Sequence, residues 1–137
     1  MRKSITLDNQ LGKAMIRHAE NAYPNEAAGI VVASGDIQFL VAEAKDQSRC
    51  GYELAASTLI NAEQGGEIVA FYHSHPDGAS YLSALDARSM RLNNQPLWPG
   101  VTWFIMSVVN GRFVDMRAYI WNSDELKFSS MAVAFNE

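Results

Sequence analysis

Apolar and polar positions along the chain change between helical and strand-like spacing, with turn residues between the segments. Residues Leu7 to Tyr23 carry apolar side chains close to helical spacing and predict a first helix, with Asp8 placed as its N-terminal cap. Residues Ala55 to Glu63 have the composition of a second helix, which Gln64-Gly65-Gly66 would end. An imperfect helical pattern predicts a third helix from Ser83 to about Asn93.

Short apolar runs rich in β-branched and aromatic residues predict the strands. Two glycine-containing turns, Ser34-Gly35-Asp36 and Asn110-Gly111-Arg112, predict β-hairpins. The segment Leu126 to Phe135 suits either a strand or a helix, and the polar stretch Glu43 to Gly51 predicts a loop. The predicted strands are residues 28–33, 37–41, 68–72, 101–109 and 113–121. Since helices and strands interleave, we expect an α/β fold with a mixed, largely antiparallel sheet flanked by helices.

Length and composition limit the class of protein. A chain of 137 residues with 48% hydrophobic and 19% charged residues predicts a single domain, residues 1–137, with one core. No apolar run approaches the roughly 20 residues of a membrane span, and no signal-peptide core follows the first residues. We therefore expect a cytoplasmic protein. The net charge of -4 argues against a nucleic-acid backbone as the main partner.

The single cysteine, Cys50, cannot form an internal disulfide, which agrees with a reducing compartment. Cys50 could in principle act as a nucleophile with His18, His73 or His75, but no second feature of the sequence supports that chemistry. We expect His18 to be a surface or half-buried residue of the first helix.

The strongest chemical pattern follows the predicted strand of residues 68–72. His73 and His75 stand two positions apart, so both imidazoles point to the same side of an extended chain. A proline-aspartate-glycine turn comes next, and then Ser83 and Asp86, which share a helix face because they are three positions apart. The whole pattern is His-x-His, seven residues, Ser-x-x-Asp.

These residue types suit zinc. Two neutral imidazoles and one carboxylate make three protein ligands, the number that a catalytic zinc uses when its fourth position holds water. Each half of the pattern has an ordinary alternative, since His-x-His is common and Ser83-x-x-Asp86 is close to a capping box. The complete pattern is rare, so we predict one Zn²⁺ per chain with His73, His75 and Asp86 as its ligands.

A general base is the remaining requirement. Glu26 lies where a loop meets the strand of residues 28–33, a junction at which side chains often face a site, although a loop glutamate in water is the ordinary alternative. Glu67 is six positions from His73 on one predicted strand, about 20 Å in an extended chain and out of hydrogen-bond reach. The other candidates are Glu20, expected to be a solvated surface charge, and the weaker rivals Glu53 and Glu63.

The motif as a whole resembles a known family. His73-Ser74-His75-Pro76 followed by Ser83-Ala84-Leu85-Asp86 resembles the signature of the JAMM metalloproteases, also called MPN-plus or JAB-type domains. The resemblance extends from the first helix to about Trp121 and implies a cytidine-deaminase-like three-layer α/β fold. The family usually supplies a glutamate upstream as general base, which matches Glu26. Many bacterial relatives carry cysteine where this chain has Ala28, a position that is not a ligand.

The resemblance also implies a function. A compact bacterial or phage-type member would be a zinc isopeptidase or peptidase that cleaves after the C-terminus of ubiquitin or a ubiquitin-like or sulfur-carrier protein. Glu26 would be its base, and Ser83 would stabilise the oxyanion. Trp98 would lie either at the rim of the substrate groove or at the core edge.

Three other functions stay open at this stage. The first is a phage tail-tip assembly protein, in which similar domains occur. The second is a non-catalytic MPN scaffold, although such scaffolds have usually lost ligands that this chain keeps. The third is hydrolysis of a small amide or a deaminase-like reaction, and the lack of a Cys-x-x-Cys pair argues against the deaminase.

Overall fold

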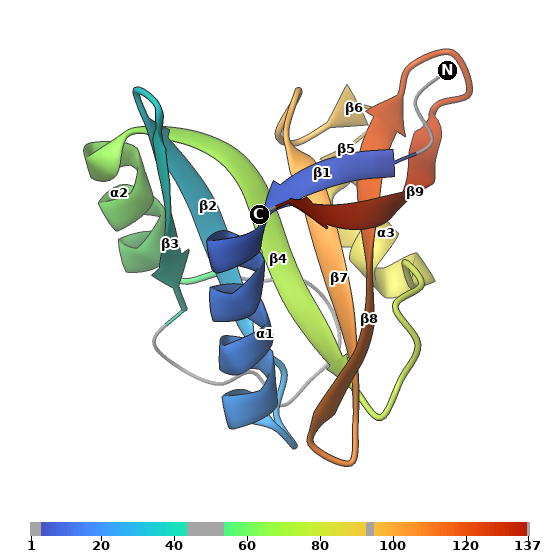
Figure 1. Ribbon diagram of the computed structural model, residues 1–137. Helices are drawn as coiled ribbons and strands as arrows, with labels where there is room; N and C mark the ends of the chain where they lie inside the picture. The colour runs from blue at the N-terminus through green and yellow to red at the C-terminus, as the bar shows by residue number, and fades with distance from the viewer. Residues whose placement is uncertain (1–3, 44–53, 93–94, 137) are drawn as a thin grey trace.

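The computed structural model describes residues 4–43, 54–92 and 95–136. Seven strands form the main sheet, and a short two-stranded sheet lies apart from it. The main strands are β1 (Ser4–Asp8), β2 (Ala28–Ser34), β3 (Ile37–Ala42), β4 (Glu67–Pro76), β7 (Thr102–Val109), β8 (Arg112–Asn122) and β9 (Lys127–Asn136). The other elements are the helices α1 (Asn9–Ala22), α2 (Ala56–Gly65) and α3 (Ala84–Ser89) and the short strands β5 (Arg91–Leu92) and β6 (Gln95–Pro96). The main sheet has the order β1-β9-β8-β7-β4-β2-β3 (Figure 1).

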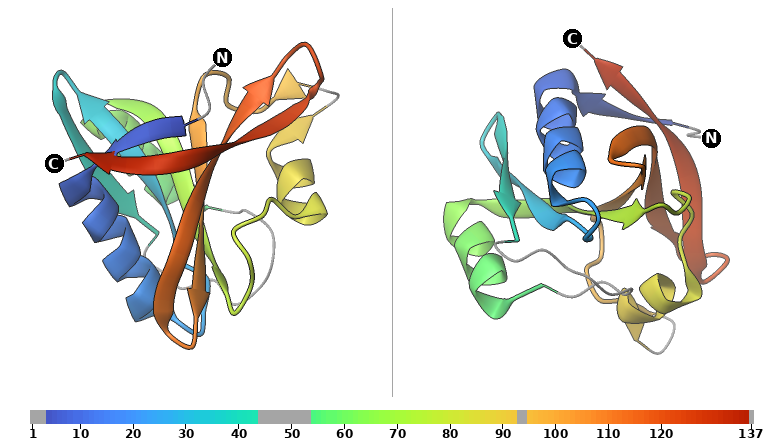
Figure 2. Two further views of the ribbon diagram at one scale, coloured as in Figure 1. Left: turned by 45° about the vertical axis from the view of Figure 1, so that its right-hand side comes forward. Right: turned by 90° about the horizontal axis from the view of Figure 1, so that it is seen from below.

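The sheet is mixed, as the sequence predicts. The pairs β4–β7 and β1–β9 are parallel, and the other neighbours are antiparallel. Both predicted hairpins form, with positive φ angles at Gly35 in one turn and at Asn110 and Gly111 in the other. Figure 2 shows that the sheet curls strongly, so that β1 and β9 cross over the end of α1.

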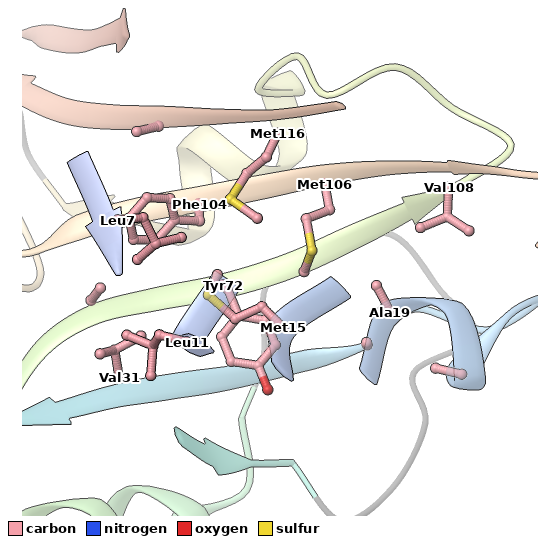
Figure 3. Packing of buried hydrophobic residues seen from close by; sticks show 14 residues of the cluster. Leu7, Leu11, Met15, Ala19, Val31, Tyr72, Phe104, Met106, Val108 and Met116 are labelled. Atoms are coloured by element: carbon pink, nitrogen blue, oxygen red, sulfur yellow. The ribbon is translucent and has the colours of Figure 1, made fainter. Parts of the chain in front are cut away.

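Helices cover both faces of the sheet. Met15 of α1 is fully buried and packs in one cluster with Tyr72 and Met106 (Figure 3). Ala62 of α2 is also fully buried, but it packs in a second cluster with Ile30 and Phe71. The side chains of this second cluster lie on the face of the sheet opposite to that of Tyr72. This arrangement follows from the alternation of side chains along buried strands, in which neighbouring residues such as Phe71 and Tyr72 enter different cores.

The start of the chain differs from the prediction. Leu7, expected in the first helix, lies in β1, and α1 begins at Asn9. The predicted cap is confirmed, because the Asp8 carboxylate accepts a hydrogen bond of 3.1 Å from the backbone N–H of Leu11. The strand was missed because β1 pairs with β9 at the other end of the sequence, a contact that no local pattern reports.

The third helix is shorter than predicted. It spans only Ala84–Ser89, and the backbone N–H of Met90 closes it by donating to the carbonyls of Asp86 and Ala87. The chain then enters β5, whose partner is β6, instead of continuing as a helix to Asn93, which lies outside the described residues. Met90 is fully buried in the core under α2, so tertiary packing ends the helix here.

The structure also describes most of the remaining segments for which the sequence makes predictions. The undecided segment Leu126 to Phe135 is a strand, since β9 spans Lys127–Asn136. The apolar run 68–72 lies in β4 as predicted, but only residues 70–72 of it are buried, and Ile68 and Val69 are half-buried. Residues 44–51 of the predicted loop lie outside the described residues. Among the helices that are described, none has the length and apolar character needed to cross a membrane.

Candidate metal centre

Strand β4 carries both histidines toward its C-terminal end. It is held on both sides, because β2 pairs with it antiparallel and β7 pairs with it parallel through His75. His73 and His75 share the face of the sheet that Phe71 occupies, since side chains alternate along a strand. His73 is 1% exposed, whereas His75 is 17% exposed, so the pair lies at the boundary between core and solvent.

A tight turn brings the chain back toward the histidines. Asp77 adopts a positive φ of 57°, and its backbone N–H donates to the Val108 carbonyl at 2.6 Å. Ser83 then caps α3, where its Oγ accepts a hydrogen bond of 3.0 Å from the backbone N–H of Asp86. Asp86 thus lies in the first turn of α3, and its side chain is 1% exposed.

The three predicted ligands meet. The Oδ2 atom of Asp86 lies 3.1 Å from Nε2 of His73 and 2.9 Å from Nε2 of His75. One candidate ligand atom from each residue lies within 4.8 Å of the others. The Nδ1 atom of His75 is 2.7 Å from the carbonyl oxygen of Ala79. Because a carbonyl only accepts, Nδ1 carries the hydrogen, and the Nε2 atom of His75 can face a cation as a ligand.

The charges of the cluster suit a divalent cation. Burial lowers the pKa of His73, which keeps this imidazole neutral. Burial would also lower the pKa of His75, but hydrogen bonds to Asp86 and Ala79 and the nearby carboxylates raise it overall. Burial disfavours the charge of Asp86, yet hydrogen bonds from the two histidines hold its pKa far below the usual range. An ionised carboxylate between two imidazole nitrogens is a donor set that zinc accepts.

The Glu26 carboxyl lies close enough to this cluster to interact electrostatically with His75 and Asp86. The side chain of Glu26 is only 6% exposed, and burial raises the pKa of its carboxyl to about 8. The charges of His75 and Asp86 also act on this pKa, the first lowering it and the second raising it. The next residue, Ala27, is fixed to β4, because its N–H donates to Ser74 Oγ and its carbonyl accepts from the Ser74 N–H, both at 2.9 Å.

Three of the other four glutamates considered as a base lie within the described residues. Glu67 is exposed at the opposite end of β4 from the histidines, and Glu63 is exposed on α2. Glu20 is not the solvated surface charge that the sequence predicts, because its carboxylate accepts a hydrogen bond of 2.8 Å from the backbone N–H of Phe113. Glu53 lies outside the described residues, and so does Cys50.

The sequence also predicts where the side chains of His18 and Trp98 lie. His18 is half-buried, as predicted, and its Nδ1 atom lies 2.7 Å from the hydroxyl of Tyr72 on the α1 side of the sheet. Trp98 packs against Phe71 with ring centroids 5.2 Å apart. Of the two interpretations of Trp98, this packing supports a residue at the edge of the core.

Two residues to which the sequence motif gives no role, Ser74 and Tyr119, support the candidate site. Ser74, inside the His-x-His motif, binds the residue after Glu26. Tyr119 of β8 binds the loop that leads to Ser83, with its hydroxyl 3.1 Å from the backbone N–H of Leu82. The position of Ser74 between two histidines was a usable signal. Tyr119 has none, because it lies 37 positions from the loop that it contacts.

Residues 8–121 match the family model described as prokaryotic homologs of the JAB domain. The chain belongs to this family. It is 29% identical over 120 residues to desampylase of Haloferax volcanii, a match that covers 80% of this chain and 79% of that protein. It is also 29% identical over 92 residues to tail tip assembly protein K of Escherichia phage N15, with 66% of this chain and 37% of that protein covered. The JAB chain therefore spans only about a third of the tail tip protein.

Solved structures show the same fold. A solution structure from Desulfitobacterium hafniense has a TM-score of 0.67 and 20% identity, with 96% of this chain and 92% of that chain covered. The crystal structure of a JAB1/MPN domain protein from Archaeoglobus fulgidus has a TM-score of 0.52 and 16% identity, with 98% and 99% covered. The curled, mixed sheet with helices on both faces is thus the JAB/MPN fold.

Proposed function

We propose that this chain is a zinc-dependent peptidase or isopeptidase that cleaves the amide bond after the C-terminus of a ubiquitin-like or sulfur-carrier protein. Residues 1–137 would act as one JAB domain with one zinc ion. The observation that carries the proposal is the buried Glu26 carboxyl beside the cluster of His73, His75 and Asp86. A buried carboxyl with a raised pKa next to a three-ligand set is the pairing that water activation requires.

His73, His75 and Asp86 would hold the ion, and their two nitrogens and one oxygen fit zinc. Bound zinc would polarise the scissile carbonyl and lower the pKa of the attacking water. Because His73 is buried, its imidazole would be a rigidly held ligand, whereas the partly exposed His75 would be the ligand nearer to an approaching substrate. The Ala79 carbonyl would keep His75 in the tautomer that binds metal.

Glu26 would move the proton. In the carboxylate form it would accept a proton from the attacking water and then pass it to the leaving amine nitrogen. Burial raises the pKa of Glu26 to about 8. Positive charge next to a carboxyl lowers its pKa, so the carboxylate would be available near neutral pH in the loaded site. No covalent intermediate with the protein is needed.

Ser83 would stabilise the oxyanion. Its Oγ already accepts a hydrogen bond from the Asp86 N–H, which leaves the hydroxyl hydrogen for another acceptor. Ser83 is half-buried at the start of α3, three positions before the candidate ligand Asp86. A hydroxyl beside the cluster could therefore donate to the oxygen on which negative charge develops.

The substrate class rests on the family and on one relative. The matched relative named desampylase and the JAMM resemblance both support a ubiquitin-like protein as substrate. The similarity to tail tip assembly protein K supports a second candidate, a role in phage tail-tip assembly. A non-catalytic scaffold is the third candidate, but the retained His73, His75, Asp86 and Glu26 favour an enzyme. Hydrolysis of a small amide is a fourth.

Cleavage of a defined substrate tests the proposal. The zinc-loaded protein is incubated with a ubiquitin-like protein that carries a C-terminal peptide extension, and with one conjugated to a lysine side chain. Mass spectrometry should locate a cut directly after the natural C-terminus, which a chelator abolishes and added zinc restores. Zinc binding without cleavage of either substrate would reject the ubiquitin-like substrate and favour the tail-tip, scaffold or small-amide alternatives.

A further inference from the structure

The three candidate ligands come from two elements that a loop separates. His73 and His75 lie on β4, whereas Asp86 lies on α3, which begins after the loop of residues 77–83. The ligand atoms can meet only if this loop holds a fixed position relative to the sheet. The side chain of Tyr119, from β8, makes the contacts that fix its second half.

The Tyr119 hydroxyl bridges two backbone groups of the loop. It donates to the carbonyl oxygen of Ser80 at 3.0 Å and accepts from the backbone N–H of Leu82 at 3.1 Å. Tyr119 is 5% exposed and Ser80 is 3% exposed, so the hydroxyl meets two backbone groups at the edge of the core. Leu82 directly precedes Ser83, whose Oγ binds the backbone N–H of Asp86. Two hydrogen bonds, joined by the backbone between Leu82 and Ser83, therefore connect Tyr119 with Asp86.

The same sheet positions Tyr119 and the histidines. Tyr119 pairs with Trp103 of β7, and Trp103 pairs with Phe71 of β4. The rings of Phe71 and Trp103 stack with centroids 4.7 Å apart, and His73 follows Phe71 by two positions on the same face. Tyr119 thus holds the loop against the three strands that also set the histidines.

A second side chain of β8 also contacts the middle of the loop. Ser80 Oγ donates to the Asp115 carboxylate at 2.9 Å, and Asp115 lies four positions before Tyr119 on β8. The loop is therefore joined to β8 by side chains from both directions. Tyr119 reaches farther toward Ser83 than this contact, because its hydroxyl also binds Leu82.

We infer that Tyr119 is a positioning residue, whose hydroxyl fixes the loop so that Ser83 and Asp86 face His73 and His75. The inference rests on the proposed function, in which these groups bind zinc and act on the substrate. Tyr119 acts through the loop backbone and not through contact with the reacting atoms. Groups that hydrogen-bond a metal ligand directly typically contribute about 10- to 100-fold to metal affinity or activity, and for Tyr119, which acts one step farther from the ligands, we expect the lower end of this range.

The test is Tyr119→Phe, which removes one oxygen and keeps the ring in the core. Zinc affinity, measured by chelator competition on the metal-free protein, should fall by about 10-fold or more. On the zinc-saturated variant, kcat should fall by about 10-fold or more while KM changes little, because the substrate surface is retained. Wild-type zinc affinity in this variant would overturn the inference.

A matched control separates positioning from loss of stability. Tyr72→Phe removes the hydroxyl of another buried tyrosine, which contacts His18 in the core under α1. We expect this control to lower the melting temperature while zinc affinity and kcat stay near wild type. If Tyr72→Phe weakens zinc binding as much as Tyr119→Phe does, general destabilisation explains the effect and the inference fails.

A second variant decides the case if Tyr119→Phe does not fold. Ser80→Ala breaks the contact with Asp115 and leaves the tyrosine in place, so zinc affinity should fall in the same direction but less. Normal zinc affinity in that variant would then overturn the inference. Zinc affinity is measured without substrate, so it tests the role of Tyr119 independently of the substrate. If the wild type binds zinc but cleaves no ubiquitin-like protein, the proposed function is rejected and the inference about Tyr119 can still be tested.

Discussion

The Oδ2 atom of Asp86 lies 2.9 Å from Nε2 of His75, although the two residues are 11 positions apart and come from different elements. The same oxygen lies 3.1 Å from Nε2 of His73. The three side chains thus bring two imidazole nitrogens and one carboxylate oxygen to a single place. A cation could bind there with little movement of these side chains, since the candidate ligand atoms lie within 4.8 Å of one another.

Zinc should stabilise the wild type and not a protein without the carboxylate. A ligand that binds only the folded state adds about 2.7 kcal/mol at one hundred times its Kd. We therefore expect added zinc to raise the melting temperature of the wild type, whereas Asp86→Ala and His75→Ala should show no rise and no activity. Differential scanning calorimetry with and without zinc makes this measurement. A full zinc-dependent rise in Asp86→Ala would remove Asp86 from the ligand set.

Loss of Glu26 should affect turnover and leave metal binding intact. Glu26→Gln keeps the shape of the side chain but cannot accept and release a proton as a general base. The kcat should therefore fall by about 10²- to 10⁴-fold. Glu63→Gln, at an exposed position on α2, is the matched control and should keep full activity. Steady-state cleavage of the extended substrate gives both values. An active Glu26→Gln enzyme would exclude Glu26 as the base.

Ser83→Ala should lower both stability and rate. The hydroxyl caps α3, so its removal should cost about 0.5 to 2 kcal/mol of unfolding free energy. If it is also the oxyanion donor, kcat should fall by about 100-fold or more. Asp8→Ala is a matched control, because it removes the cap of α1, away from the site. Equal stability losses with an unchanged rate in both variants would limit Ser83 to capping.

The metal-free protein should lose stability through Glu26 as the pH rises. Burial raises the pKa of Glu26 in the folded protein from its ordinary value of 4.5 to about 8, so the folded protein holds one more proton than the unfolded chain between these pH values. This contribution is complete below about pH 4.5 and is lost as the pH rises through 8. Urea unfolding in chelator should show the stability of wild type relative to Glu26→Gln falling by up to about 1.4 kcal/mol per pH unit. A pH-independent difference would contradict a buried Glu26.

The sequence predicts much of the candidate site because its candidate ligands follow local rules. The two-position spacing on β4 puts His73 and His75 on one face, and the helix start brings Ser83 and Asp86 to the same place. The position of Glu26 at the junction before β2 also followed from turn and strand signals. In contrast, the supporting contacts of Ser74 and Tyr119 arise only when distant strands pair.

The fold was predicted where its elements carry local signals. Hairpins with glycine turns and the capped first helix are confirmed, whereas β1 and the early end of α3 were missed. The pairing of β1 with β9 depends on residues from opposite ends of the chain. The helical pattern beyond Ser89 is overridden by the burial of Met90. Glu20 was misassigned because the chain that it contacts, at Phe113, arrives only through the β7–β8 hairpin.

Zinc stoichiometry tests the central claim most directly. Elemental analysis of wild type, Glu26→Gln and His75→Ala, purified without chelator and without added metal, gives moles of zinc per mole of chain. We predict one zinc in the wild type and in Glu26→Gln, and none in His75→Ala. An absence of zinc from the wild type, or retention of a full equivalent in His75→Ala, would contradict a metal centre built from His73, His75 and Asp86.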